Sequence, residues 1–150
     1  MDRRHFIGQG AAAIGLLAGF SGQARANLQK AEILVIGGGY GGATAAKYLR
    51  LFSNNTAKVT LIEPNTSFIS CPMSNLVIGG SRTLAEITSP YDTLSKRHGI
   101  KIIQDSVSSI DPDKKIVKLA SGKTLRYDKV VVSPGVSINF KSNVGLDEAN

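Results

Sequence analysis

The sequence has 150 residues, 42% of them hydrophobic, with a formal net charge of +7 and no tryptophan. A chain of this size builds one modest hydrophobic core, which predicts one domain or part of one. The basic residues are scattered rather than gathered into a stripe, which argues against nucleic-acid binding. The single cysteine, Cys71, excludes an intrachain disulfide and a cysteine-based zinc cluster, and no residue is assigned to a metal.

Residues 1–26 have the pattern of an export signal. Arg3 and Arg4 precede an apolar run over residues 11–20, and the segment ends in Ala-Arg-Ala, a small-x-small cleavage pattern. The apolar run is shorter than the ~20 residues that span a bilayer, so no stable membrane anchor is expected. The paired arginines followed by phenylalanine resemble a twin-arginine signal, the alternative being an ordinary secretory signal. We therefore expect a bacterial periplasmic protein whose mature part is residues 27–150.

The mature part begins with an apolar run over residues 33–36 that leads directly into a glycine-rich turn. The run is typical of a strand buried on both faces of a parallel sheet. The turn fits G-x-G-x-x-G: the first glycine permits a tight turn, and the second lets the backbone approach a pyrophosphate. The third lets the following helix, expected over residues 41–52, pack close to the strand and present its N–H groups to phosphate. The residues predicted to hold the cofactor here are Gly37, Gly38, Gly39, Tyr40, Gly41 and Gly42.

A second strand is expected over residues 58–63, and it ends in Glu63, 21 residues after Gly42. A carboxylate at this position accepts hydrogen bonds from a ribose 2′-hydroxyl and disfavours a 2′-phosphate. The order strand, glycine turn, helix, strand and acidic residue therefore predicts dinucleotide binding. The alternative is a structural glycine turn followed by a solvated glutamate.

The chain after Glu63 departs from the pattern of an NAD-binding domain. We expect a loop over residues 64–73, then helices and strands over residues 74–78, 91–98, 100–104, 107–110, 115–119, 124–127 and 128–134. The three short strands between residues 107 and 127 form a β-meander. The predicted fold class is α/β, a Rossmann-like parallel sheet with a meander crossover, and incomplete. The inward face of the first helix is expected to carry Ala43, Ala46, Leu49 and Leu51.

This arrangement resembles the FAD-binding half of the FAD-dependent pyridine nucleotide-disulfide oxidoreductases, in which a meander crosses over the sheet. The resemblance implies that a strand ending at Gly135 closes on the flavin dinucleotide. Before this glycine the chain has Ser133 and Pro134, where the family more commonly has Ala-Thr. It also implies that backbone at Ser106 and Val107 touches the adenine, the alternative for Val107 being core packing. Pro64, next to Glu63, is counted with the cofactor-binding residues.

The stretch Phe68-Ile-Ser-Cys-Pro-Met-Ser-Asn-Leu-Val-Ile-Gly-Gly80 is similar to the flavoprotein subunits of flavocytochrome c sulfide dehydrogenases. The same holds for Gly-Gly-Ala-Thr-Ala-Ala-Lys-Tyr, Ile-Glu-Pro-Asn-Thr and Ile-Asp-Pro-Asp-Lys-Lys-Ile-Val-Lys elsewhere in the chain. The resemblance implies that Cys71 carries the FAD through an 8α-thioether, which would keep the flavin on an exported protein. The alternative is that Cys71 is a small buried hydrophobic residue.

The resemblance also implies an activity: sulfide is oxidised at a redox-active disulfide beside the flavin, and the electrons pass to a c-type cytochrome subunit. The chain has no second cysteine and no Cys-x-x-Cys-His, so no catalytic residue is assigned and no c-type haem binds to it. We expect it to be the amino-terminal portion of a longer enzyme, inactive and poorly folded alone because apolar surface is left uncovered. The alternatives are a sulfide:quinone oxidoreductase, an NADH-type flavin oxidoreductase, and a FAD-binding fragment without turnover.

Overall fold

The computed structural model describes residues 30–136, so the predicted export signal lies outside the described residues. The centre of the fold is a four-stranded sheet in the order β5-β2-β1-β9, in which all neighbouring strands are parallel. Its strands are β1 (Glu32–Ile36), β2 (Lys58–Ile62), β5 (Lys101–Ile103) and β9 (Lys129–Val132). The predicted parallel sheet is confirmed, and its strands run within one or two residues of the expected ranges.

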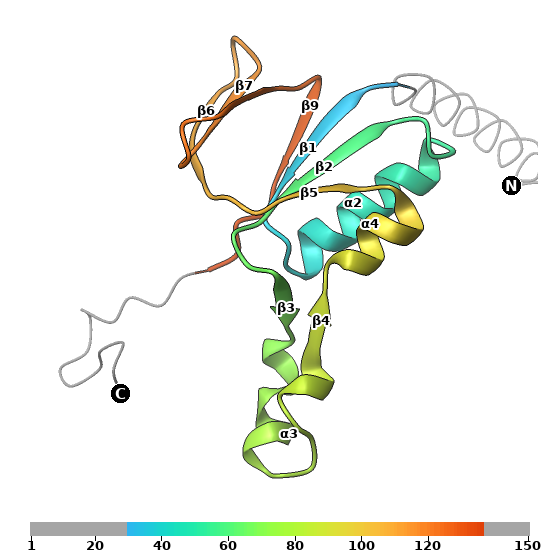
Figure 1. The fold of residues 1–150 in the computed structure, drawn as a ribbon, viewed down its shortest axis with the longest axis vertical. Coiled ribbons are helices and arrows are strands. Elements are labelled where there is room, and N and C mark those ends of the chain that lie inside the picture. Colours follow the sequence, from blue (N-terminus) through green and yellow to red (C-terminus); the bar gives the residue numbers. More distant parts are fainter. Residues whose placement is uncertain (1–29, 137–150) are drawn as a thin grey trace, which may run out of the picture.

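The sheet lies between a helical layer and an antiparallel meander (Figure 1). Helices α2 (Tyr40–Phe52) and α4 (Asp92–His98) form the helical layer. The meander consists of β6 (Val107–Asp111), β7 (Ile116–Leu119) and β8 (Thr124–Arg126), paired in that order. This three-layer arrangement confirms the predicted α/β fold with a meander crossover.

Strand β1 shows why the chain folds in layers. Its alternate side chains Ile33 and Val35 pack in one buried cluster with Ala46 of α2. Leu34 and Ile36 belong to a second cluster, on the opposite face, with buried side chains of the meander. Because successive side chains of a strand point to opposite faces, an unbroken apolar run is buried only when both faces are covered.

The segment after Glu63 forms an arm that extends away from the sheet (Figure 1). Strands β3 (Ser67–Ile69) and β4 (Thr88–Pro90) pair antiparallel at its base. The arm also contains a 3₁₀ turn (Cys71–Met73), helix α3 (Ser74–Ile78) and a second 3₁₀ turn (Ala85–Ile87). The expectation of an unbroken loop over residues 64–73 was wrong because β3 is stabilised by a partner strand some 20 residues away, which local patterning does not show.

Helix α2 buries less of its surface than its sequence suggested. Ala46 is fully buried and Leu49 packs against the same cluster, as expected. Leu51, expected to face inward, is 41% exposed. At 3.6 residues per turn, Leu51 lies roughly 140° around the helix from Ala46, which turns it away from the sheet. Among the described residues, no helix is long and apolar enough to cross a membrane.

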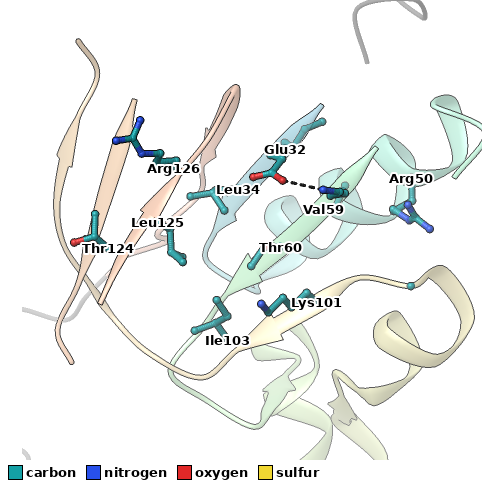
Figure 2. A pocket seen from close by; sticks show the side chains of 13 residues that line it. Glu32, Leu34, Arg50, Val59, Thr60, Lys101, Ile103, Thr124, Leu125 and Arg126 are labelled. Atoms are coloured by element: carbon teal, nitrogen blue, oxygen red, sulfur yellow. Dashed lines mark hydrogen bonds and ion pairs between the residues drawn. The ribbon is translucent and has the colours of Figure 1, made fainter. Parts of the chain in front are cut away.

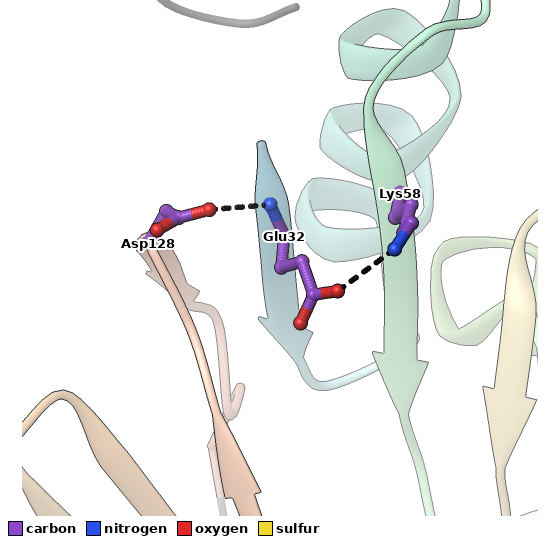
Figure 3. Close-up of polar contacts among 3 residues, drawn as sticks. All are labelled: Glu32, Lys58 and Asp128. Atoms are coloured by element: carbon purple, nitrogen blue, oxygen red, sulfur yellow. Dashed lines mark hydrogen bonds and ion pairs between the residues drawn. The ribbon is translucent and has the colours of Figure 1, made fainter. Parts of the chain in front are cut away.

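A polar contact fastens the amino end of the central strand (Figure 3). The Glu32 N–H donates to Asp128 Oδ2 at 2.8 Å, and Lys58 Nζ lies 3.0 Å from Glu32 Oε1. These residues begin or precede three neighbouring strands, so the contacts agree with the parallel register of Glu32 with Lys58. The ion pair is solvent-exposed and adds little stability by itself.

Replacing Leu61 tests how much the buried cluster between the sheet and the helices contributes to stability. Leu61 is fully buried in the middle of β2, so Leu61→Ala should lower the free energy of unfolding by about 2–5 kcal/mol through a cavity. The matched control is Leu51→Ala on the exposed side of α2, which should change it by less than about 1 kcal/mol. Urea unfolding of the protein expressed from its whole gene, followed by circular dichroism, measures both free energies. Equal losses would contradict the placement of these two leucines.

Candidate cofactor site

Two glycines of the turn, Gly37 and Gly42, have no room for a side chain. Gly37 has a φ of +93°, and a Cβ added there would lie 2.0 Å from the carbonyl oxygen of Ser133. A Cβ at Gly42 would lie 1.8 Å from the carbonyl oxygen of Gly37. The first and third glycines of the pattern are therefore required by the packing of the turn against β9 and α2, as the pattern predicts.

Glu63 lies at the carboxyl end of β2 and is 8% exposed. Its Oε2 accepts a hydrogen bond from the Gly38 N–H at 2.7 Å, and its Oε1 accepts from Asn65 N at 3.0 Å and Asn65 Nδ2 at 2.7 Å. These three donors fix the carboxylate in one orientation. Oε1 already accepts two hydrogen bonds and Oε2 only one, so Oε2 can still receive a hydrogen bond from a ribose.

A pocket of about 310 Å³ opens beside Glu63, and we call it the Glu63 pocket. Its lining comes from the carboxyl ends of β1 and β2, the start of the meander and the segment after β9. The lining residues are Ile36, Gly37, Ile62, Glu63, Pro64, Asn65, Asp105, Ser106, Val107 and Pro134. The structure thus brings together the predicted Gly37, Glu63, Pro64 and Val107. Asn65 was missed, although an asparagine two residues after the acidic position is a common turn-forming signal.

The amino terminus of α2 faces the same end of the sheet and lacks a side-chain cap. Gly39, its N-cap residue, makes no side-chain capping bond, and a Cβ added at Gly39 would meet nothing within 4 Å. The first N–H groups of a helix have no intrahelical partner and favour a negative charge. This open, uncapped terminus fits the pyrophosphate of a dinucleotide.

Tyr40, the first residue of α2, is bound to the arm. Its hydroxyl hydrogen-bonds to the Ser70 hydroxyl, and its ring meets the Phe68 ring edge-on with centroids 4.7 Å apart. This link ties the amino end of α2 to Cys71, which follows Ser70 directly. Cys71 is exposed, with its Sγ 3.8 Å from the carbonyl oxygen of Ile69. The alternative that Cys71 is a buried hydrophobic residue was therefore wrong.

Several predicted residues lie outside the Glu63 pocket. Gly38, Gly39 and Tyr40 line a second cavity of about 350 Å³ between α2, α4 and the base of the arm, which we call the α2–α4 cavity. Gly135 follows β9 with a φ of +77°, as a turn glycine should, but lines neither space. That the predicted residues contact a cofactor stays a prediction.

A larger cavity, of about 450 Å³, lies away from all the predicted residues. It lies between β8, the last strand of the meander, and the face of the sheet that the meander covers. Figure 2 shows Leu125 and Thr124 of β8 opposite Leu34, Thr60 and Ile103 of the sheet. Among residues 30–136, no cluster of His, Cys, Asp or Glu side chains is arranged to hold a metal ion.

Tyr91 was missed by the sequence analysis, which placed it at the start of a short helix. It is 6% exposed and donates a hydrogen bond from its hydroxyl to the Gly38 carbonyl oxygen at 2.9 Å. Burial and the nearby negative charge of Glu63 raise the pKa of Tyr91 to about 12. The hydroxyl therefore stays protonated and able to donate at neutral pH. No pattern around Tyr91 indicated that contact.

The family model of the pyridine nucleotide-disulphide oxidoreductases matches residues 31–148. The chain belongs to this family. The membership implies binding of a flavin, FAD, and confirms the predicted superfamily. The uncapped helix terminus and the Glu63 pocket fit its dinucleotide.

The relatives of this chain include proteins named for sulfide. It is 32% identical over 120 residues to the mitochondrial sulfide:quinone oxidoreductase of Mus musculus, covering 78% of this chain and 26% of the relative. It is 53% identical over 46 residues to the flavoprotein chain of sulfide dehydrogenase [flavocytochrome c] of Chlorobaculum thiosulfatiphilum, covering 31% of this chain and 94% of that one.

The crystal structure of the sulfide:quinone oxidoreductase from Aquifex aeolicus superposes on the fold with a TM-score of 0.68 and 34% identity, over 73% of this chain and 25% of that one. The chain thus spans about a quarter of the length of the mouse and Aquifex relatives.

The second and third glycines of the turn should respond differently to an added methyl group. Gly42→Ala should lower the free energy of unfolding by about 1–3 kcal/mol or more, because its Cβ meets the Gly37 carbonyl. Gly39→Ala, whose Cβ meets no protein atom, should change it by less than about 1 kcal/mol. It should nevertheless weaken FAD binding about tenfold or more, because the methyl group lies where the pyrophosphate approaches. Thermal unfolding and FAD titration measure this in protein that also carries Cys71→Ser, so that any flavin binds reversibly. Unchanged FAD affinity in Gly39→Ala would contradict the site.

Proposed function

We propose that this chain is the FAD-binding portion of a longer, exported flavoprotein that oxidises sulfide and passes the electrons to a c-type cytochrome subunit. The observation that carries the proposal is the 53% identity over 46 residues to the flavoprotein chain of a flavocytochrome c sulfide dehydrogenase. The exposed position of Cys71 is compatible with the proposal, since its thiol is accessible to a flavin.

The chain's own residues would hold the FAD at three places. Glu63, fixed by Gly38 and Asn65, would accept a hydrogen bond at Oε2 from the ribose next to the adenine. The N–H groups at the start of α2 would bind the pyrophosphate. Cys71, on the arm at the same end of the sheet, would attach the flavin ring and prevent its loss after export. When bound, the flavin supplies the redox chemistry.

No described residue is assigned to the chemical step. A disulfide that reacts with sulfide would have to come from residues beyond this sequence, because Cys71 is its one cysteine. The described residues bind and orient the cofactor, and the Tyr40–Ser70 hydrogen bond holds the start of the Cys71 turn against α2.

The second candidate function is a sulfide:quinone oxidoreductase. The mouse and Aquifex relatives favour it, because they are 32% and 34% identical over most of this chain. The two functions share the FAD site and differ in the electron acceptor.

The acceptor assay tests the proposal directly. The protein expressed from its whole gene, together with a co-expressed cytochrome subunit, should reduce added cytochrome c when sulfide is supplied. A soluble quinone offered in place of cytochrome c should be reduced much more slowly. Preferential quinone reduction would favour the second candidate, and no sulfide-dependent reduction of either acceptor would contradict both.

Covalent attachment gives a second, independent readout. After acid denaturation and centrifugation, the yellow colour should stay with the wild-type polypeptide and move to the supernatant in Cys71→Ser. The matched control is Ser81→Ala, which changes another exposed residue of the arm and should retain the colour on the polypeptide. Free flavin released from the wild-type protein would contradict attachment at Cys71 while leaving FAD binding itself intact.

A further inference from the structure

Tyr91 reaches the glycine turn from inside the protein. It precedes α4, and its ring lies in the buried cluster on the helical face of the sheet. From there its hydroxyl donates to the Gly38 carbonyl oxygen at 2.9 Å. A Cβ at Gly38 would lie 2.5 Å from that hydroxyl oxygen, so the absence of a side chain at Gly38 is what allows the contact.

The hydrogen bond determines the direction of the next N–H group. The Gly38 carbonyl and the Gly39 N–H belong to one planar peptide, and no peptide in the described chain is cis. In a trans peptide these two groups point in opposite directions. Because the carbonyl points toward the buried tyrosine, the Gly39 N–H points away from the protein interior, at the residue where an added Cβ meets no protein atom.

Gly38 is held from a second side as well. Its own N–H donates to Glu63 Oε2 at 2.7 Å, so one glycine is fixed by the residue assigned to the ribose and by Tyr91. The turn therefore has its donors oriented before any ligand arrives, which lowers the conformational cost of binding.

We propose that Tyr91 is a positioning residue for the dinucleotide: its hydroxyl orients the Gly38–Gly39 peptide so that the Gly39 N–H donates to the pyrophosphate. This inference rests on the proposed FAD binding and assigns Tyr91 no direct contact with the cofactor. The tyrosine is protonated at neutral pH, since burial and the charge of Glu63 raise its pKa to about 12.

The test compares two tyrosines that are buried on opposite faces of the sheet. Tyr91→Phe removes the hydroxyl and keeps the ring, and Tyr127→Phe does the same at an 8% exposed tyrosine packed with the meander. Both are made in the whole-gene protein carrying Cys71→Ser, so that flavin binds reversibly. Apoprotein of each is titrated with FAD and with ADP, which carries the pyrophosphate without the flavin, and its melting temperature is recorded.

Tyr91→Phe should weaken both FAD and ADP binding about tenfold relative to the Cys71→Ser parent, the size expected when a hydrogen bond to a charged group is misdirected. Tyr127→Phe should leave both affinities within about twofold of the parent. This should hold even where Tyr127→Phe lowers the melting temperature as much as Tyr91→Phe does. Unchanged affinities in Tyr91→Phe, or equal losses in both variants, would overturn the inference while leaving the proposed function intact. A parent protein that binds neither ligand would overturn the proposed function, and this inference with it.

Discussion

The near-contact between Gly37 and Gly42 is the constraint on which the rest of the site depends. A Cβ on Gly42 would lie 1.8 Å from the Gly37 carbonyl oxygen, so helix α2 begins almost against the end of β1. This closeness aims the amino terminus of α2 at the carboxyl edge of the parallel sheet. Ser133, which follows β9, covers the other side of the turn and leaves Gly37 no room for a side chain. One turn is thus fixed by both neighbouring elements.

From that turn the structure extends in two directions that correspond to the two ends of a dinucleotide. Glu63 and the Glu63 pocket lie toward the meander, where the resemblance places the adenosine half. The Tyr40–Ser70 contact leads the other way, to the arm and Cys71. The arm bears exposed apolar side chains, among them Ile78 at 88% and Leu84 at 56% exposure. Patches of this kind indicate surface that packs against other protein.

The local patterns predicted most of this architecture because each has a short-range physical cause. The first strand, expected over residues 33–36, the short helix expected over residues 91–98, and the three strands of the meander follow from apolar runs and turn-forming residues. Two expectations were wrong, for different reasons. Strand β3 exists because the distant strand β4 pairs with it, whereas Leu51 is exposed because the helical period turns it away from the sheet-facing side of α2.

By itself, the sequence determined the parallel sheet, the glycine turn, the acidic residue after the second strand and the family. Those features depend on residue type and spacing within about 30 positions, which a pattern records. Only the tertiary structure decided that Asn65 and Gly38 fix the Glu63 carboxylate, that Cys71 is exposed, and that Tyr91 holds the Gly38 carbonyl. Tyr91 lies 53 residues from Gly38, and the contact exists because folding buries its ring beneath the turn. No local rule relates a buried tyrosine to the peptide that its hydroxyl reaches.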